Sequence, residues 1–333
     1  MKRREFITLT GCAAALSSLW SLPLSAQPAN RPQRVGILMG IAESDPEGQA
    51  RVAALQRGLQ ELGWVDGRNL LFDIRRTAGE PEQLRPLAEE MVQLKPELII
   101  AATTSAVAAL LQVTRTVPIV FVQVIDPLGS GFISSLARPG GNVTGFVTFE
   151  FSMGGKWLET LKQAAPRVTR VALIFNPQTA PFSSSFVRLI EEAAPSLAIE
   201  TTAMPVQNSV ELESKVTAFA AKAGGGLIVL PDLFNTSHRD TIVAAAARHG
   251  LPSVYPFRYF ATSGGLISDG VDTGELYRRS ASYIDRILKG AKPGDLPIQG
   301  PSKFELVINL RTAKALGLEI PQMLLARADE VLE

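Results

Sequence analysis

The feature that most constrains this 333-residue chain is a repeated alternation of short apolar runs with amphipathic segments. Residues 34–39 form such a run, and Val52, Leu55 and Leu59 then recur at helical spacing before Gly63. The apolar runs predict buried strands, and the spaced residues predict helices. Strands of a parallel sheet are buried on both faces, so their runs are continuously apolar. The order therefore predicts an α/β fold in which helices cover both faces of parallel sheets.

The alternation runs through two consecutive parts of the chain. In the first part we expect strands at 34–39, 70–74, 97–101 and 118–124, and helices at 48–62, 81–94 and 106–113. The pattern restarts after Gly140-Gly141-Asn142, with strands at 143–149, 170–175, 199–205, 226–230 and 253–255, and helices at 154–165, 182–194, 210–221 and 236–249. The sequence thus predicts two Rossmann-like lobes, joined near residues 148–152.

The last part of the chain is too small for a core of its own. It offers an extended piece at 265–268, a helix at 274–289, a strand at 304–309 and a helix at 312–316. We expect the chain to cross back to the first lobe near 262–268 and to return to the second near 300. Three crossings would form a three-stranded hinge, a usual device for closing lobes around a ligand. The predicted lobes are 32–147 with 266–299, and 148–265 with 300–333.

Residues 1–26 predict an export signal. The pair Arg3-Arg4 precedes a short apolar run at 7–24, and small residues at 25–27 suit cleavage. The paired arginines favour the twin-arginine route and a periplasmic location. A disordered or anchoring N-terminus is the alternative. Residues 9–12 resemble a lipoprotein cleavage box ending at Cys12, but the apolar stretch before them is short, which disfavours a lipid anchor.

Composition argues against several classes of partner. Removal of residues 1–26 takes three basic and one acidic residue from the 33 and 32 of the full chain, leaving 30 and 31. A near-neutral chain lacks the basic face that nucleic acid requires, so no nucleic-acid partner is expected. The only cysteine lies in the signal, and His238 and His249 are not spaced for one helical turn, so no metal site is expected.

The sequence also lacks the motifs of common cofactor and nucleophile sites. Gly36 stands alone after the first strand, without the glycines of a dinucleotide-binding turn. There is no phosphate-binding loop and no nucleophile elbow. We therefore expect no cofactor and no enzymatic activity.

Polar residues gather instead where strands end, and ligands of open parallel sheets bind at those ends. In the first lobe the candidates are Ile41 and Ala42 after the first strand, Thr104 and Ser105 after the third, and Asp126 after the fourth. The hydroxyl groups would suit an anion at the start of a helix, and the carboxylate would suit an ammonium group. The alternatives are simple capping of that helix and of the turn before Gly129.

Four further candidates lie in the second part of the chain. Phe234 and Asn235 follow the strand that ends near Leu230, and Phe234 would either stack on a ligand or pack as a staple for the next helix. Tyr255 belongs to an aromatic cluster for which packing of the hinge is the alternative. Asp269 follows a returning strand and would face the cleft.

Several motifs resemble one family, the ABC-transporter substrate-binding proteins of the periplasmic type I class. These motifs are Pro118-Ile119-Val120-Phe121 through Asp126-Pro127, and residues 136–145, 284–290, 303–310 and 325–330, together with the opening Arg3-Arg4-Glu5-Phe6-Ile7. The similarity extends over nearly the whole chain. It implies two lobes of the leucine-binding type with the ligand between them.

The resemblance also implies roles for the candidate residues. Thr104 and Ser105 would hold the carboxylate of an amino-acid-like ligand and Asp126 its amine, while Phe234 and Asn235 would close over it. Relatives often carry tyrosine where Asp269 stands in this chain. The aspartate would favour a ligand with an extra cation.

The resemblance implies a monomeric, exported binding protein that delivers a small polar ligand to an ABC permease in the inner membrane. A periplasmic sensing subunit for a membrane receptor, or a secreted enzyme on the same frame, are the alternatives.

Overall fold

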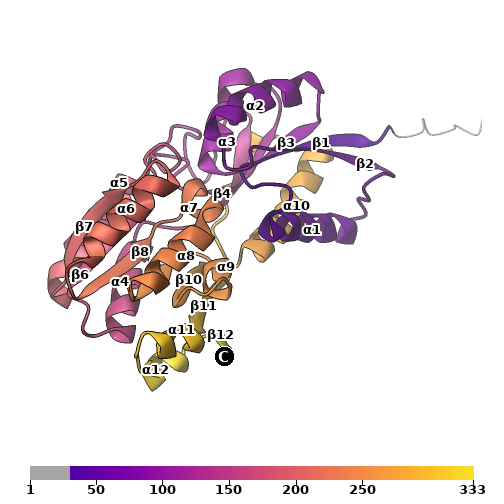
Figure 1. Ribbon diagram of the computed structural model, residues 1–333. Helices are drawn as coiled ribbons and strands as arrows, with labels where there is room; N and C mark the ends of the chain where they lie inside the picture. The colour runs from indigo at the N-terminus through magenta and orange to yellow at the C-terminus, as the bar shows by residue number, and fades with distance from the viewer. Residues whose placement is uncertain (1–30) are drawn as a thin grey trace, which may run out of the picture. The chain divides into compact units, whose positions relative to one another are not determined.

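The computed structural model describes residues 31–333. It contains two sheets with helices packed against both (Figure 1). The strand at 143–147 completes the first sheet, and the last part of the chain adds three strands to the second. The α/β class with two parallel-sheet lobes is therefore confirmed. The export signal expected at residues 1–26, including Cys12, lies outside the described residues.

The first lobe is built on a five-stranded parallel sheet with the order β2-β1-β3-β4-β5. Its strands are β1 (Gln33–Met39), β2 (Leu70–Arg76), β3 (Leu98–Ala102), β4 (Ile119–Val124) and β5 (Val143–Val147). Its helices are α1 (Pro46–Glu61), α2 (Leu84–Gln93), α3 (Thr104–Val113) and α10 (Thr273–Leu288), with short 3-10 turns η1 (Pro81–Gln83) and η3 (Pro293–Asp295).

Successive residues of β1 face opposite helical layers. Ile37 packs with α1 and α10, whereas its neighbour Leu38 packs with α2 and α3. Figure 1 shows α1 and α10, far apart in sequence, lying side by side. This two-sided burial explains the continuous apolar run of β1, because neither face of this central strand meets water.

The second lobe is built on a seven-stranded sheet with the order β12-β11-β10-β9-β8-β6-β7. Its strands are β6 (Arg170–Phe175), β7 (Glu200–Pro205), β8 (Gly225–Val229), β9 (Ser253–Tyr255), β10 (Ile267–Val271), β11 (Phe304–Asn309) and β12 (Glu330–Leu332). Its helices are α4 (Met153–Ala164), α5 (Ser183–Ala193), α6 (Ser209–Ala220), α7 (Leu233–Ser237), α8 (Arg239–Arg248), α9 (Arg258–Thr262), α11 (Leu310–Ala315) and α12 (Gln322–Leu325), with the turn η2 (Ala194–Leu197). All strand pairs are parallel except β10 with β11.

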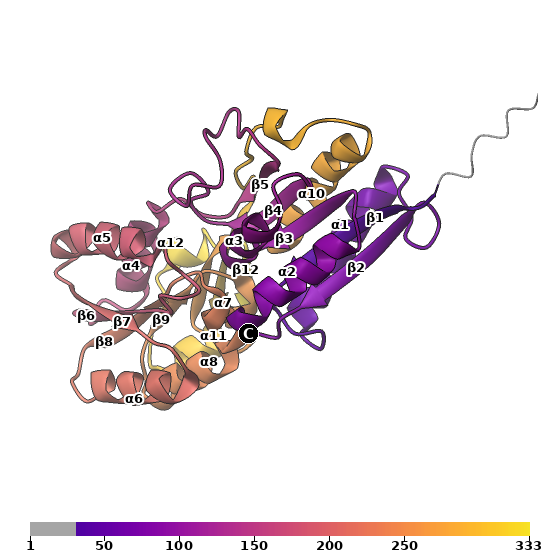
Figure 2. The same cartoon turned by 90° about the horizontal axis from the view of Figure 1, so that it is seen from above.

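The chain passes between the sheets three times, and the second passage lies later than expected. Residues from 266 onward were assigned to the first lobe, but β10 pairs with β9 and β11 of the second sheet. The chain returns to the first lobe at Asp272, where α10 begins, and Figure 2 shows this segment beside β4 and β5. The five-residue strand β10 is paired on both sides within the second sheet. The sequence pattern alone did not indicate this pairing.

Helix α8 is shorter than expected because the predicted helix at 236–249 is two helices. Asp232 accepts a hydrogen bond from the N–H of Phe234 and so begins α7 early. His238 has non-helical backbone angles between α7 and α8. The loop after β8 is thereby kept close to the end of its strand.

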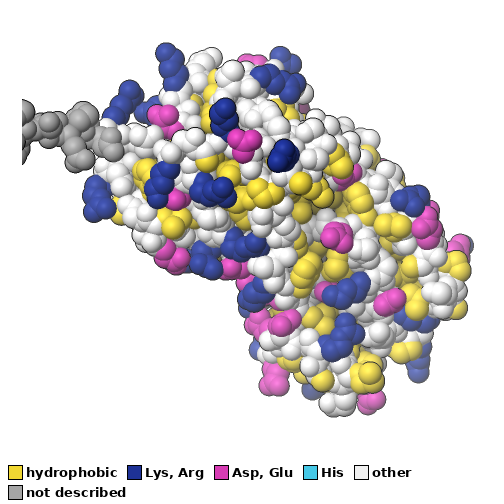
Figure 3. Space-filling model, turned by 180° about the vertical axis from the view of Figure 1, so that it is seen from behind, with side chains coloured by type: hydrophobic (Ala, Val, Ile, Leu, Met, Phe, Trp, Pro, Cys, Tyr) yellow, Lys and Arg dark blue, Asp and Glu magenta, His cyan; other side chains and the backbone are white. Residues whose placement is uncertain are grey.

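No helix among residues 31–333 is long and apolar enough to cross a membrane. On the face shown in Figure 3, basic and acidic side chains are interspersed, without a field of one sign. That distribution agrees with the nearly balanced charge of the sequence.

Candidate functional site

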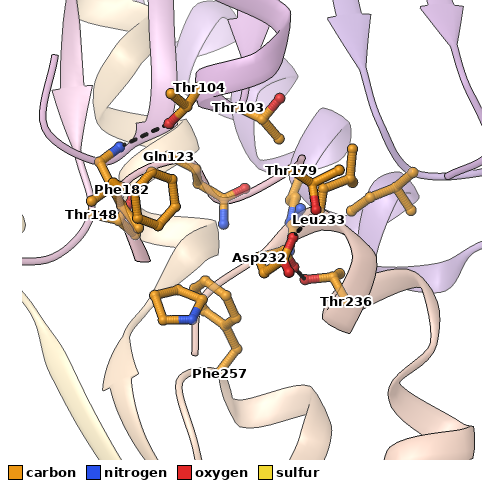
Figure 4. A pocket seen from close by; sticks show the side chains of 14 residues that line it. Thr103, Thr104, Gln123, Thr148, Thr179, Phe182, Asp232, Leu233, Thr236 and Phe257 are labelled. Atoms are coloured by element: carbon orange, nitrogen blue, oxygen red, sulfur yellow. Dashed lines mark hydrogen bonds between the residues drawn. The ribbon is translucent and has the colours of Figure 1, made fainter. Parts of the chain in front are cut away.

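A cavity lies where the carboxyl ends of strands from the two sheets meet (Figure 4). The space between its lining side chains is about 490 Å³ when the solvent at its open mouth is included. From the first lobe and the first crossing it is lined by Ile41, Arg51, Thr103, Thr104, Gln123, Ile125 and Thr148. From the second lobe it is lined by Thr179, Phe182, Pro231, Asp232, Leu233, Thr236 and Phe257.

The start of α3 supplies hydroxyl groups to one side of the cavity. Thr103 caps the helix, accepting a hydrogen bond from the N–H of Ala106 at 3.2 Å. The hydroxyl of Thr104 accepts one from the N–H of Ile125 at 3.3 Å. Each hydroxyl keeps its own proton to donate. The first N–H groups of a helix have no acceptor within the helix, so this end of the cavity favours an anion.

Asp232 places a buried carboxylate on the opposite side. Its Oδ2 accepts a hydrogen bond from the N–H of Asn176 at 2.6 Å, and its Oδ1 accepts from the N–H of Phe234 at 2.9 Å and from the hydroxyl of Thr179. Burial raises the pKa of Asp232 to about 6, against the opposing effect of these hydrogen bonds. No basic side chain of residues 31–333 forms an ion pair with it.

Arg51, from the middle of α1, brings a buried cation to the same cavity. Its side chain is 4% exposed, and its Nε and Nη2 atoms have no hydrogen-bond partner in the described part of the chain. The guanidinium lies over the ring of Tyr259, 5.6 Å from the centroid. A buried guanidinium without a carboxylate partner is costly, which is typical of a site that awaits an anion.

Aromatic rings form the remaining wall. Figure 4 shows Phe182 and Phe257 on the side of the cavity away from Leu233, with Gln123 above Phe257. Phe257 is fixed by Phe149 and Tyr259, whose ring centroids lie 5.5 and 5.3 Å away. These rings offer a flat apolar surface to part of a ligand.

The lobes also contact each other beside the cavity. Asp45, which caps α1, accepts a hydrogen bond from Arg239 of α8, with an Nη1–Oδ2 distance of 2.6 Å. Arg239 lies over the ring of Tyr259, 5.8 Å from the centroid. Tyr259 thus contacts one arginine from each lobe.

Residues 35–332 match the family model described as ABC transporter substrate binding protein. The chain belongs to this family.

Three relatives illustrate the family likeness. A tyrosine-binding protein of Clostridioides difficile is 25% identical over 312 residues, which cover 93% of this chain and 88% of the relative. A crystal structure of a conserved domain protein from Vibrio cholerae has a TM-score of 0.84 and 28% identity, covering 90% of this chain and all of the other. A Streptococcus pneumonia ABC domain in complex with L-Trp has a TM-score of 0.83 and 25% identity, with the same coverage.

In this substrate-binding protein, two of the expected site residues, Ile41 and Thr104, line the central cavity. Ser105 and Asp126 line a neighbouring groove between α3 and the start of α5. Asp126 accepts a hydrogen bond from the N–H of Gly129 at 2.8 Å, the turn-capping role named as the alternative. Ala42 supports its own loop, since its carbonyl accepts a hydrogen bond from the N–H of Asp45.

The other four expected residues have partners within the second lobe. Phe234 stacks on His238, with ring centroids 4.1 Å apart, and Tyr255 stacks on Phe260 at 5.0 Å. Asn235 donates from Nδ2 to the carbonyl oxygens of Ile174 and Leu230, joining the ends of β6 and β8. None of these three lines the cavity.

Asp269 also lies away from the cavity. Its carboxylate is 2% exposed and pairs with the Nζ of Lys156 at 3.2 Å, and its carbonyl accepts from the Trp157 indole at 2.7 Å. The cation that the sequence analysis assigned to a ligand is therefore supplied by the chain itself.

Sequence reasoning missed most of the polar lining. Asp232 follows β8 in the same segment as Phe234. The position of strand ends therefore indicated this segment, but the residues chosen from it were Phe234 and Asn235. Gln123 and Arg51 carried no signal, because one lies inside a strand and the other inside a helix. Phe182 and Phe257 were not among the expected site residues.

Proposed function

We propose that this protein captures a free α-amino acid with an aromatic side chain and delivers it to an ABC permease. One observation carries the proposal. The cavity is lined by a buried carboxylate and a buried guanidinium, neither of which has an ion-pair partner among residues 31–333. Two isolated buried charges of opposite sign complement a zwitterion.

Asp232 is the proposed partner of the ligand ammonium group. A cation placed against the carboxylate offsets the desolvation that now raises its pKa. Three hydrogen bonds from Thr179, Asn176 and Phe234 fix the carboxylate, and Oδ2 accepts only one of them. Acceptor capacity therefore remains for an ammonium N–H.

Arg51 and the start of α3 are the proposed partners of the ligand carboxylate. The unpartnered Nε and Nη2 of Arg51 can donate to both oxygens of a carboxylate at once. The hydroxyls of Thr103 and Thr104 and the free N–H groups of α3 favour the same charge. Thr104 thus keeps the role that the family resemblance implied, whereas Asp232 takes the role expected of Asp126.

The aromatic wall is the proposed contact for the ligand side chain. Phe182 and Phe257 offer ring faces to a flat group. The names of two relatives support an aromatic ligand, since one is a tyrosine-binding protein and another was crystallised with L-Trp. We place the protein in the periplasm as a monomer that binds its ligand without chemical conversion.

Binding to purified protein tests the proposal. L-tyrosine and L-tryptophan should raise the melting temperature, because ligand at a hundredfold excess over Kd adds about 2.7 kcal/mol of stability. Tyramine lacks the carboxylate and N-acetyl-L-tyrosine lacks the ammonium group, so neither should bind comparably. If a sugar or a purine stabilises the protein and no amino acid does, the proposal is rejected. Ligand recovered unchanged after incubation is expected; conversion would indicate an enzyme.

A further inference from the structure

Strand β4 carries a one-residue bulge at Gln123. Val122 pairs with Phe146 and Val124 pairs with Val147, so no residue of β5 stands opposite Gln123. Its φ angle is 62°, in the left-handed region that costs energy for a residue other than glycine. A bulge of this kind re-aims a side chain and is common beside binding sites.

The core layers show that the bulge shifts the strand by one residue. Before it, Phe121 packs with the α2 and α3 layer, and Val122 with the α1 and α10 layer. Simple alternation would place Val124 with Val122, but Val124 packs in the layer of Phe121. Gln123 is therefore an inserted residue that belongs to neither layer, and the strand keeps both cores intact around it.

The side chain of Gln123 ends in the cavity with an unsatisfied atom. It lines the site between the threonines of α3 and Phe257 (Figure 4). Its Oε1 atom is buried and has no hydrogen-bond partner within residues 31–333. A buried acceptor that makes no hydrogen bond destabilises the protein, because it has lost its contact with water and gained no partner. The structure thus bears both a strained backbone and an unpaired acceptor at one position.

The zwitterion groups of the proposed ligand leave this acceptor unused. Asp232 and Arg51 complement the ammonium and the carboxylate, and both line the cavity with Gln123. The remaining part of an amino acid is its side chain, which the two phenylalanines would flank. A donor on that side chain would satisfy Oε1, whereas a bare hydrocarbon ring would leave it buried and unpaired.

We propose that Gln123 is a specificity-determining residue that selects aromatic amino acids carrying a side-chain hydrogen-bond donor. Its amide oxygen accepts from a phenol O–H or an indole N–H, and it disfavours a plain phenyl ring. This inference rests on the proposed function, because it assumes that an amino acid occupies the cavity. Sites built to hydrogen-bond a ligand group discriminate strongly against analogues that lack it.

The test compares ligands and variants by isothermal titration calorimetry. The wild-type protein is titrated with L-tyrosine, L-tryptophan, L-phenylalanine and 4-fluoro-L-phenylalanine, which has nearly the shape of tyrosine but no donor. The variant Gln123→Met keeps the length of the side chain and removes the amide. Gln112→Met, at an exposed position on α3, is the matched control.

We expect the wild-type protein to bind L-tyrosine at least about tenfold more tightly than the two ligands without a donor. Q123M should lose about tenfold in affinity for L-tyrosine and keep its affinity for L-phenylalanine, while Q112M changes neither. Retained L-phenylalanine binding also shows that the cavity of Q123M is folded.

Three results would overturn the inference. The first is equal wild-type affinity for L-tyrosine and 4-fluoro-L-phenylalanine, a comparison that needs no variant. The second is an equal loss of affinity for L-tyrosine and L-phenylalanine in Q123M, which would mean that the amide contacts the ammonium or carboxylate group that both ligands share. The third is a preference of Q123M for L-tyrosine over L-phenylalanine that equals that of the wild-type protein. If the wild-type protein binds no amino acid at all, the proposed function fails first.

Discussion

At the scale of single residues, two buried aspartates show how environment separates roles. Asp269 pairs with Lys156 and is 2% exposed. Asp232 is 7% exposed, faces the cavity and has no basic partner among the described residues. Both follow the strand-end pattern in the sequence. Only the structure shows that one charge is neutralised within the chain while the other has no basic partner among the described residues.

The raised pKa of Asp232 predicts pH-dependent binding. The pKa is about 6 without ligand, and the ammonium group requires the ionised carboxylate. Affinity should therefore be constant above pH 7 and weaken about tenfold per pH unit below pH 6. Titration of L-tyrosine between pH 5 and 8 measures this, and Asp126→Asn serves as a control that keeps the wild-type profile. A flat profile in the wild-type protein contradicts the assignment.

The same pKa predicts that the variant Asp232→Asn, without ligand, gains stability relative to the wild type as the pH rises. The folded-state pKa lies above the ordinary value of 3.8, so the stability linked to protonation is full below pH 3.8 and is lost as pH rises through about 6. At pH 7 a neutral side chain avoids this loss, which amounts to about 2–3 kcal/mol. Melting temperatures at pH 4 and pH 7 test it. The amide nitrogen of the variant cannot accept the N–H hydrogen bond that one carboxylate oxygen accepts, and this cost is present at both pH values. The melting temperature of D232N relative to the wild type should therefore be higher at pH 7 than at pH 4, and D232N should lose ligand affinity.

Arg51 predicts a carboxylate contact that lysine cannot fully replace. Arg51→Met should weaken binding of L-tyrosine about a hundredfold, and Arg51→Lys should recover only part of it, because lysine lacks the two-pronged donor geometry. Arg57→Met, on the exposed side of α1, is the control and should bind as the wild type does. Calorimetry with L-tyrosine and tyramine measures the effect, because tyramine has no carboxylate for Arg51 to bind. Equal losses for both compounds would count against the contact.

At the scale of elements, α1 connects the core of the first lobe to the site. One face of α1 packs on α10, Arg51 reaches the cavity, and Asp45 at its cap contacts Arg239. Close approach of α1 and α10 depends on Gly58, where a Cβ would overlap the carbonyl oxygen of Arg278. The position of Arg51 is therefore set by the packing of two helices that are far apart in sequence.

This packing predicts opposite effects of alanine at two helical glycines. Gly58→Ala should destabilise the protein by about 1–3 kcal/mol, because the neighbouring atom is backbone and cannot move aside. Gly155→Ala, in α4, has its closest neighbour at 3.7 Å and should stabilise by about 0.5–1 kcal/mol. Urea denaturation of both variants measures the difference. A Gly58→Ala variant as stable as the wild type would show that the helices can separate at little cost.

At the scale of the whole molecule, the site exists only because the chain passes three times between two sheets. Residues from both lobes line one cavity, and the Asp45–Arg239 pair connects the lobes beside it. Both side chains of this pair are largely buried, at 11% and 15% exposure, so solvent screens it less than a surface pair. Contacts that join the lobes should support ligand binding rather than the stability of either lobe.

A double-mutant cycle tests this coupling. Arg239→Met and Asp45→Asn should each weaken L-tyrosine binding, by about fivefold or more, and the double variant should be no weaker than the worse single variant. Asparagine at position 45 retains the helix cap, so the comparison isolates the ion pair. Additive losses in the double variant, or no loss in either single variant, would contradict a role for the pair in binding.

The sequence by itself determined the α/β class, the two lobes and most element bounds, because strand burial on both faces and helical spacing leave local traces. Local pattern also indicated the strand ends where Ile41 and Thr104 line the cavity. Tertiary structure alone decided the sheet of β10 and the placement of Arg51, Gln123 and Asp232 around one cavity. The physical reason is that a side chain becomes a binding group or a structural one according to whether its charge or hydrogen bond is satisfied by a distant segment, and no local pattern records that pairing.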